Sequence, residues 1–289
     1  MLWPIFALSA AVFASLKDIF SKHGIKQANL DEYVTSWSLK FFSLIPLLPL
    51  LFFIKIPRLG NYFWVALFIG GGLNTLTSIL YMKAIKHSDL SLTIPMITFT
   101  PLFLLVTSPI IVHEFPSIYG LIGIILIVFG SYILNLKERH KGYFAPFRAL
   151  IKENGPKLML LVAFIWSITS NIDKIGVKNS SPVFWAVANA IFWAITLSTI
   201  MLIKSRKSIK YVPVNLKVLI PIGIFEGLAA VTQMTAINLT LVAYVVSIKR
   251  TSAIISVLSG YFIFKEKGIR ERLIGVIIMV VGVMLITLS

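Results

Sequence analysis

Two adjacent cations, Lys249 and Arg250, stand in the otherwise apolar stretch of residues 245–260. A lysine can bind an anion as a point charge, and an arginine can give two parallel hydrogen bonds to a carboxylate or a phosphate. A charge left in the apolar centre of a membrane costs about 2.5–3.5 kcal/mol on insertion scales. The pair therefore favours an anion-binding site, and a structural ion pair with the acidic residue Glu226 is the alternative.

Glu226 lies near the middle of the apolar segment LIPIGIFEGLAAVTQMTAIN, residues 219–238. Gln233 follows two helical turns later, so both side chains are expected on one face of a helix. Two interpretations of Glu226 stay open. It either compensates the charge of Arg250 or acts as a proton-linked carboxylate in a central cavity.

Aromatic residues within apolar segments could hold a quaternary ammonium group by cation–π attraction. The candidates for such a cage are Trp37, Trp166, Trp185, Trp193 and Tyr244. The alternative is an aromatic belt at the membrane surface. We keep Trp37, Trp166 and Tyr244 as candidate site residues.

Three charged residues, Lys17, Asp18 and Lys22, lie towards the end of the first apolar segment. Asp18 and Lys22 are one helical turn apart, in the orientation that stabilises a helix. We interpret this group as helix-end pairing.

Motifs of catalysis are missing from the sequence. The four histidines form no H-E-x-x-H pair, and there is no Gly-x-Ser-x-Gly elbow or P-loop. Since there is no cysteine, disulfides and thiolate metal sites are excluded. We expect no enzyme activity, no cofactor and no metal.

The composition is that of an integral membrane protein, with 57% hydrophobic and 13% charged residues among 289. The net charge of +16 resides mostly in short segments between apolar runs, which favours membrane topology over nucleic-acid binding. Ten apolar segments are long enough to span a bilayer as helices. They cover residues 3–22, 34–54, 62–83, 90–112, 116–136, 157–177, 182–203, 216–238, 242–264 and 270–288.

An internal repeat relates the two halves of the chain. A shift of 152 residues aligns SLKDIFSKHGIK with SITSNIDKIGVK, YMKAI with QMTAI, and LIGIILIVFG with LIGVIIMVVG, and it pairs Glu114 with Glu266. We therefore divide the chain into a first five-helix repeat (1–136), a connecting loop (137–156) and a second five-helix repeat (157–289). Because five is odd, the second repeat enters the membrane inverted.

Inverted repeats are typical of secondary transporters, which bind substrate between the repeats near the middle of the membrane. The first-half equivalents of Glu226 and Gln233 are Asn74 and Tyr81, so polar side chains occupy the same offset in both repeats. We expect these residues, with Lys249 and Arg250, to border one cavity.

Each half also resembles the EamA-type repeat of the drug/metabolite transporter superfamily. The resemblance rests on a Lys closing the first span, Ser181-Pro182 opening the seventh, Ala-Ile ending the third, a Glu after the fourth and G-x6-G in the fifth. Ser-Pro is missing before the second span, and Trp37 and Asn189 replace an arginine typical of the family. The resemblance implies a carrier of small metabolites. The Lys249–Arg250 pair is also similar to one that contacts phosphate in plastid triose-phosphate translocators.

We therefore predict an all-α secondary active transporter that moves a small polar, anionic metabolite, a carboxylate or a phosphorylated compound, by alternating access. A multidrug or choline-type cation carrier and a flippase for a lipid-linked phosphate are the alternatives. Expected partners are the substrate, a possible coupling proton or ion, and the lipid bilayer, without nucleic acid. The sequence leaves the oligomeric state open.

Small residues and prolines predict how the helices pack and bend. The pairs Gly123/Gly130 and Gly275/Gly282 place small residues two turns apart on one helix face, which favours close packing over chemistry. The GGG at 70–72 and the Gly223/Gly227 pair should likewise thin the third and eighth helices at crossings. Prolines 95, 101 and 109 should bend the fourth helix.

The basic residues also predict orientation. The segments 137–157, 204–217 and 265–272 are rich in Lys and Arg and lie on the same side of the membrane. Because such segments face the cytoplasm, we place the protein in the plasma membrane as a multi-pass protein with both termini outside the cytoplasm.

Overall fold

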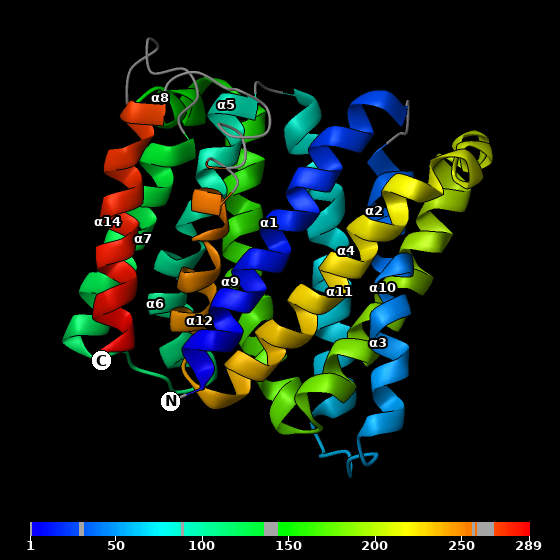
Figure 1. Ribbon diagram of the computed structural model, residues 1–289, viewed down its shortest axis with the longest axis horizontal. Helices are drawn as coiled ribbons and strands as arrows, with labels where there is room; N and C mark the ends of the chain where they lie inside the picture. The colour runs from blue at the N-terminus through cyan, green and yellow to red at the C-terminus, as the bar shows by residue number, and fades with distance from the viewer. Residues whose placement is uncertain (1, 29–31, 88–89, 136–143, 256–257, 259–268) are drawn as a thin grey trace. The chain divides into compact units, whose positions relative to one another are not determined.

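The computed structural model describes residues 2–28, 32–87, 90–135, 144–255, 258 and 269–289. Within these ranges every regular element is a helix (Figure 1). The α-helices are α1 (Trp3–Ala28), α2 (Glu32–Phe42), α3 (Leu44–Leu50), α4 (Phe63–His87), α5 (Leu90–Thr93), α6 (Thr100–Ile111), α7 (Ile118–Asn135), α8 (Ala145–Lys152), α9 (Asn154–Lys178), α10 (Pro182–Lys204), α11 (Leu216–Leu239), α12 (Val242–Lys249) and α14 (Ile269–Thr287). The 3₁₀ helices are η1 (Leu51–Phe53), η2 (Ile94–Phe99), η4 (Arg206–Tyr211) and η5 (Pro213–Asn215).

Seven helical segments in the described part of the chain are long and apolar enough to cross a membrane. They are Trp3–Ser21, Tyr33–Phe53, Phe63–Tyr81, Ile94–Ile111, Asn154–Lys178, Pro182–Lys204 and Ser208–Leu239. Two shorter apolar helices, Ile118–Leu134 and Leu273–Thr287, fall where the fifth and tenth spans were predicted. A polytopic all-α membrane protein is confirmed, whereas the number of ten spans stays a prediction.

The predicted second span, 34–54, is bent within the membrane segment. Helix α2 ends at Phe42, and α3 follows after a single residue, Ser43. Pro46 has no N–H to donate to the carbonyl of Phe42, four residues earlier, so a continuous α-helix is interrupted there. The Ser43 hydroxyl instead donates to the carbonyl oxygen of Lys40, at 2.7 Å. The bend therefore lies directly beside Lys40.

The chain forms two compact units. Unit 1 consists of Met1–Thr75 and Asp173–Leu239, and unit 2 consists of Leu76–Ile172 and Thr240–Ser289. The boundaries fall within α4 and α9, so these two helices contribute residues to both units. Each unit thus combines parts of both halves of the sequence.

In unit 1, α11 packs against α1, α2, α3 and α10, and α1 lies along α11 in Figure 1. The crossing with α2 and α3 is close because α11 carries glycines there. A Cβ atom at Gly223 would collide with the Phe42 side chain, and one at Gly227 would lie 2.6 Å from the carbonyl oxygen of Ser43. Likewise, a Cβ at Gly71 would meet the Phe192 ring. The predicted thinning of the third and eighth helices is confirmed.

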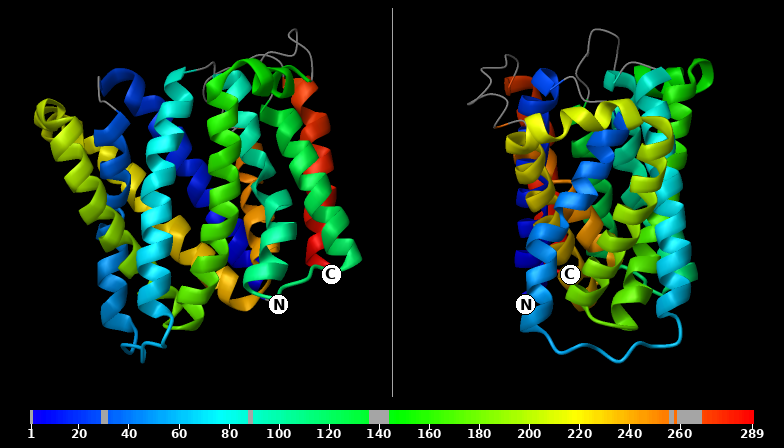
Figure 2. Two further views of the ribbon diagram at one scale, coloured as in Figure 1. Left: turned by 180° about the vertical axis from the view of Figure 1, so that it is seen from behind. Right: turned by 90° about the vertical axis from the view of Figure 1, so that its right-hand side faces the viewer.

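In unit 2, α7 and α14 lie side by side (Figures 1 and 2). A Cβ at Gly123 would lie 2.6 Å from the carbonyl oxygen of Gly282, and one at Gly130 would lie 2.6 Å from that of Gly275. The early glycine of one helix therefore meets the late glycine of the other, so the two helices are antiparallel. This reciprocal pairing is the relation that inverted repeats require of the fifth and tenth helices, and it confirms that these glycines serve packing.

Helix α12 ends at Lys249, inside the predicted span 242–264. The amide groups of Arg250 and Thr251 donate to carbonyls three residues earlier, at 3.0 and 2.9 Å, in the tighter 3₁₀ pattern. The ninth predicted span is thus interrupted after Lys249, and helical residues follow again at 252–255. Residues 256–257 and 259–264 of the span lie outside the described residues.

A matching interruption occurs in the fourth predicted span, where α5, η2 and α6 follow one another. Pro101 offers no N–H to the carbonyl of Ile97, and the Thr100 hydroxyl donates to that carbonyl at 2.8 Å. The predicted bend is confirmed. Residues 97–98 correspond to 249–250 in the repeat, and the second interruption contains no proline. Proline is therefore not the only cause of these breaks.

Candidate functional site

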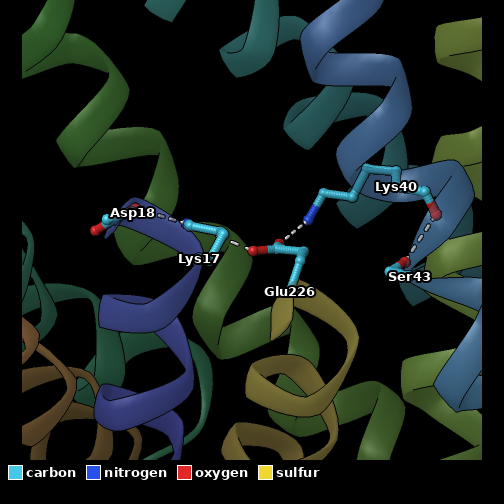
Figure 3. Close-up of polar contacts among 5 residues, drawn as sticks. All are labelled: Lys17, Asp18, Lys40, Ser43 and Glu226. Atoms are coloured by element: carbon cyan, nitrogen blue, oxygen red, sulfur yellow. Dashed lines mark hydrogen bonds and ion pairs between the residues drawn. The ribbon is translucent and has the colours of Figure 1, made fainter. Parts of the chain in front are cut away.

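Three charged side chains meet in unit 1, and we name Lys17, Lys40 and Glu226 the lysine–glutamate cluster (Figure 3). Glu226 Oε1 accepts a hydrogen bond from the Lys40 ammonium, and Oε2 lies 3.5 Å from Lys17 Nζ. The three side chains are 19%, 18% and 24% exposed for Glu226, Lys40 and Lys17. Asp18 Oδ1 also lies 3.4 Å from Lys17 Nζ, but the Asp18 side chain is 53% exposed, so we do not count it in the cluster.

The local fold explains why these residues meet. Glu226 lies on α11 between Gly223 and Gly227, where the absent side chains let α11 approach the end of α2. Lys40 lies in the last turn of α2, immediately before the bend at Ser43. Close crossing and bend together bring the carboxylate of one helix to the ammonium of the other.

An aromatic ring completes the surroundings of Lys40. Its Nζ lies 3.9 Å from the ring centroid of Trp193, within the range of a cation–π contact. The indole Nε1 of Trp193 is buried and has no hydrogen-bond acceptor in the described part of the chain. Lys40 is thus held by a carboxylate and an aromatic face together.

A second carboxylate lies in the same unit. Asp173 accepts hydrogen bonds from Trp185 Nε1 at 2.9 Å and from Asn189 Nδ2 at 3.0 Å, and it also interacts electrostatically with Lys40. Trp185 is completely buried. Its indole is therefore engaged in the core of unit 1, which argues against its predicted role in an aromatic cage.

The other predicted site residues of unit 1 are Trp37, Asn74 and Gln233. Trp37 precedes Lys40 by one turn of α2, stacks on Phe41 with centroids 4.7 Å apart, and donates to Ser198 Oγ at 2.7 Å. Asn74 is buried in α4, and Gln233 is half-buried in α11. Their roles stay predictions, as does the predicted pairing of Glu226 with Arg250, which belongs to the other unit.

In unit 2, Lys249 and Arg250 lie where α12 ends, and both residues are half-buried. The Nε atom of Arg250 is buried and finds no acceptor among the residues that the structure describes. A guanidinium only donates hydrogen bonds, so this N–H group needs an acceptor that the described residues do not supply.

Tyr81 and Trp166, both predicted site residues, stack on each other in unit 2 with ring centroids 6.1 Å apart. Trp166 Nε1 donates to Thr77 Oγ1 at 3.1 Å. This pair is half-buried and lies beside the core cluster that contains Met96 and Met159.

Tyr244 and Glu114 hold helix ends in unit 2. The Tyr244 hydroxyl accepts from the backbone N–H of Ser117, at 3.0 Å, just before α7 begins, and its ring covers Gly120. Glu114 Oε2 accepts from the N–H of Val242, the first residue of α12, at 2.7 Å. The glutamate of the family-like pattern thus caps a helix. Its predicted repeat partner, Glu266, lies outside the described residues.

Sequence reasoning missed Lys17 and Lys40. Lys40 is a lone cation in the apolar run SWSLKFFSLIP, which is the same signal that singled out Lys249. Lys17 was assigned to helix-end pairing, but its ion pair with Glu226 on another helix corrects that assignment. The predicted pair of Asp18 with Lys22 stays a prediction, because the Lys22 side chain lies outside the described residues.

The sequence matches the EamA-like transporter family over residues 1–136 and again over 154–288. None of the curated proteins matches the chain. A solved crystal structure is similar in fold, with a TM-score of 0.78 at 15% identity, over 99% of this chain and 97% of that chain. The chain belongs to the EamA-like transporter family, and it is a multi-pass membrane transporter.

Proposed function

We propose that the protein is a secondary active transporter that moves a small polar anion, a carboxylate or a phosphorylated metabolite, by alternating access. Membership of a transporter family supports transport in general. The observation that favours an anion is the guanidinium of Arg250, which offers a buried N–H with no acceptor in the described residues.

The position of Arg250 strengthens this inference. It follows the last residue of α12, where the backbone changes to 3₁₀ geometry. Interrupted helices at membrane depth are tolerated where they are buried in protein or line a wet cavity, and transporters use them at substrate sites. We infer that Arg250 gives paired hydrogen bonds to the anionic group and that Lys249 adds a point charge.

The aromatic pair of unit 2 supports an organic substrate. Stacked rings such as Tyr81 and Trp166 offer apolar contact to the carbon skeleton of a metabolite, and each ring carries a polar edge. We propose these two residues as substrate contacts, and we keep Asn74, Gln233 and Trp37 as candidates within unit 1.

A second candidate function is a carrier of organic cations. The observation that favours it is Lys40, whose ammonium lies between the Glu226 carboxylate and the Trp193 ring. A carboxylate beside an aromatic face is the chemistry that binds a quaternary ammonium group. A substrate of this class would replace the Lys40 ammonium and would leave Arg250 without a role in binding.

Uptake into liposomes separates the two candidates. Liposomes containing the purified protein are incubated with a defined mixture of carboxylates, phosphorylated metabolites, zwitterions and quaternary amines, and their contents are measured by mass spectrometry. We expect enrichment of an anionic subset, which Arg250→Ala abolishes and Arg250→Lys strongly reduces because the planar fork is lost. Arg148→Ala, on the exposed face of α8, is the matched control and should leave uptake unchanged. Enrichment of quaternary amines alone would refute the anion carrier.

A further inference from the structure

We propose that Lys17 and Lys40 form an anion-binding site in unit 1, in which the Glu226 carboxylate is a tethered competitor that withdraws when it takes up a proton. The proposal rests on the proposed function in one respect, because it takes a small anion as the cargo. It adds a second group of binding residues and a reason for proton coupling.

The first observation is the division of the carboxylate between two cations. Oε1 of Glu226 binds Lys40 of α2, whereas Oε2 lies 3.5 Å from Lys17 of α1. An incoming carboxylate or phosphate has the same two acceptor oxygens at the same spacing. Glu226 therefore occupies the place that such a group would take, and it does so from a third helix, α11, whose side chain can swing away.

The second observation is a donor that Glu226 leaves unused. Trp193 lies against Lys40, and its buried indole N–H has no acceptor in the described part of the chain. An indole nitrogen only donates, so what is missing there is an oxygen. A phosphate, with more oxygens than a carboxylate side chain, can bind both lysines and still supply that acceptor.

If the lysine–glutamate cluster is to keep its net charge when an anion binds, it must take up a proton. Helices α1 and α2, which pack against α11, bring Lys17 and Lys40 to Glu226. Two further carboxylates act on these lysines: Asp18 lies 3.4 Å from Lys17 Nζ, and Asp173 of α9 interacts electrostatically with Lys40. Helix α3 has no titratable side chain, and α10 has only Lys204, at its far end.

If a monoanion took the lysines while Glu226 stayed ionised, the displaced carboxylate would be buried without a cation. Uptake of one proton by Glu226 restores the original charge of the cluster. Anion binding at this site is therefore linked to uptake of one proton, so it becomes stronger as the pH falls.

Thermal unfolding of the purified full-length protein in detergent tests this linkage. The probe is methanesulfonate, a permanent monoanion, compared with chloride at equal ionic strength. In the unaltered protein, methanesulfonate should raise the unfolding midpoint more at mildly acidic than at mildly alkaline pH. Glu226→Gln imitates the protonated carboxylate, so its response should be independent of pH. If the carboxylate occupies the lysines nine-tenths of the time or more, its removal raises the apparent affinity at alkaline pH at least about tenfold.

Two further variants make the test decisive. Asp18→Asn also removes a carboxylate from Lys17, but an exposed one, and should behave like the unaltered protein. The double variant Lys40→Gln with Glu226→Gln removes the buried charges as a pair, so it serves as a folded control even where Glu226→Gln alone fails to fold. At mildly acidic pH it should respond less than the unaltered protein. A response that is equal at both pH values in the unaltered protein, or a response at mildly acidic pH that is as large in the double variant, would overturn the proposal.

The binding measurement involves no transport. Liposomes that take up no anion would therefore refute the proposed function while leaving a positive methanesulfonate result in place. Conversely, anion uptake that depends on Arg250, combined with a methanesulfonate response that does not change with pH, would refute only the site at Lys17 and Lys40.

Discussion

Charged residues in apolar segments are the features by which this sequence is most informative. Lys249, Arg250 and Glu226 stand out because each carries a charge that a membrane helix normally excludes. The partners that the structure gives Glu226, namely Lys17 and Lys40, were not predicted. The ion pairs of Glu226 depend on the bend at Ser43 and on the glycine-mediated crossing of α11, and both are properties of three-dimensional packing.

A residue-scale prediction concerns Tyr244, which the sequence offered as part of an aromatic cage. Tyr244→Phe removes the acceptor of the Ser117 N–H group and should lower the free energy of unfolding by about 0.5–1.5 kcal/mol. Chemical unfolding in detergent measures this. Tyr119→Phe removes an exposed hydroxyl on the same helix end and should have no effect. If Tyr244→Phe left the stability unchanged and abolished binding of a quaternary amine, the interpretation of Tyr244 as part of an aromatic cage would be favoured instead.

At the scale of helices, glycine spacing predicted which helices pack closely, but the sequence predicted less well where a helix is interrupted. The G-x6-G motifs of α7 and α14 implied a close contact, and the structure adds that the two motifs face each other in antiparallel order. The prolines of the fourth predicted span correctly indicated the interruption at η2. The interruption after Lys249, where α12 packs against α6 and α7, has no proline or glycine beside it by which the sequence could have predicted it.

An element-scale prediction follows from the glycine contacts. Gly130→Ala would place a methyl group 2.6 Å from both the Gly275 carbonyl oxygen and Met279 Cγ. The helices must separate, which should cost about 1–3 kcal/mol of stability. Gly72→Ala, also within a helix, meets no atom within 4 Å and should be neutral or stabilising by up to about 1 kcal/mol. Equal unfolding midpoints for the two variants would contradict the close α7–α14 contact.

For the whole molecule, the repeat was the decisive sequence signal. Its two copies coincide closely with the two matches to the transporter family, at 1–136 and 154–288. The repeats did not reveal the compact units, since each unit takes helices from both halves and the boundaries fall inside α4 and α9. The repeat in the sequence marks the segment that is duplicated. The compact units are set instead by which helices pack against one another, and the repeat does not show this.

Orientation is a prediction at the same scale. We propose that both termini lie outside the cytoplasm, because the Lys- and Arg-rich connecting segments share one side. A reporter that is active only in the cytoplasm should therefore be silent when fused to Ser289, and active when inserted between residues 152 and 157. The reverse pattern would invert the proposed topology.

Transport of an anion by alternating access is tested by a counterflow experiment. Liposomes are preloaded with an excess of the anion that the uptake mixture identifies, and entry of a labelled trace of the same compound is followed over time. We expect a transient accumulation of label above its equilibrium level, absent from Arg250→Ala, because each outward passage of the carrier returns a site that can load label. Entry of label at the same rate and to the same level in preloaded and empty liposomes would contradict it.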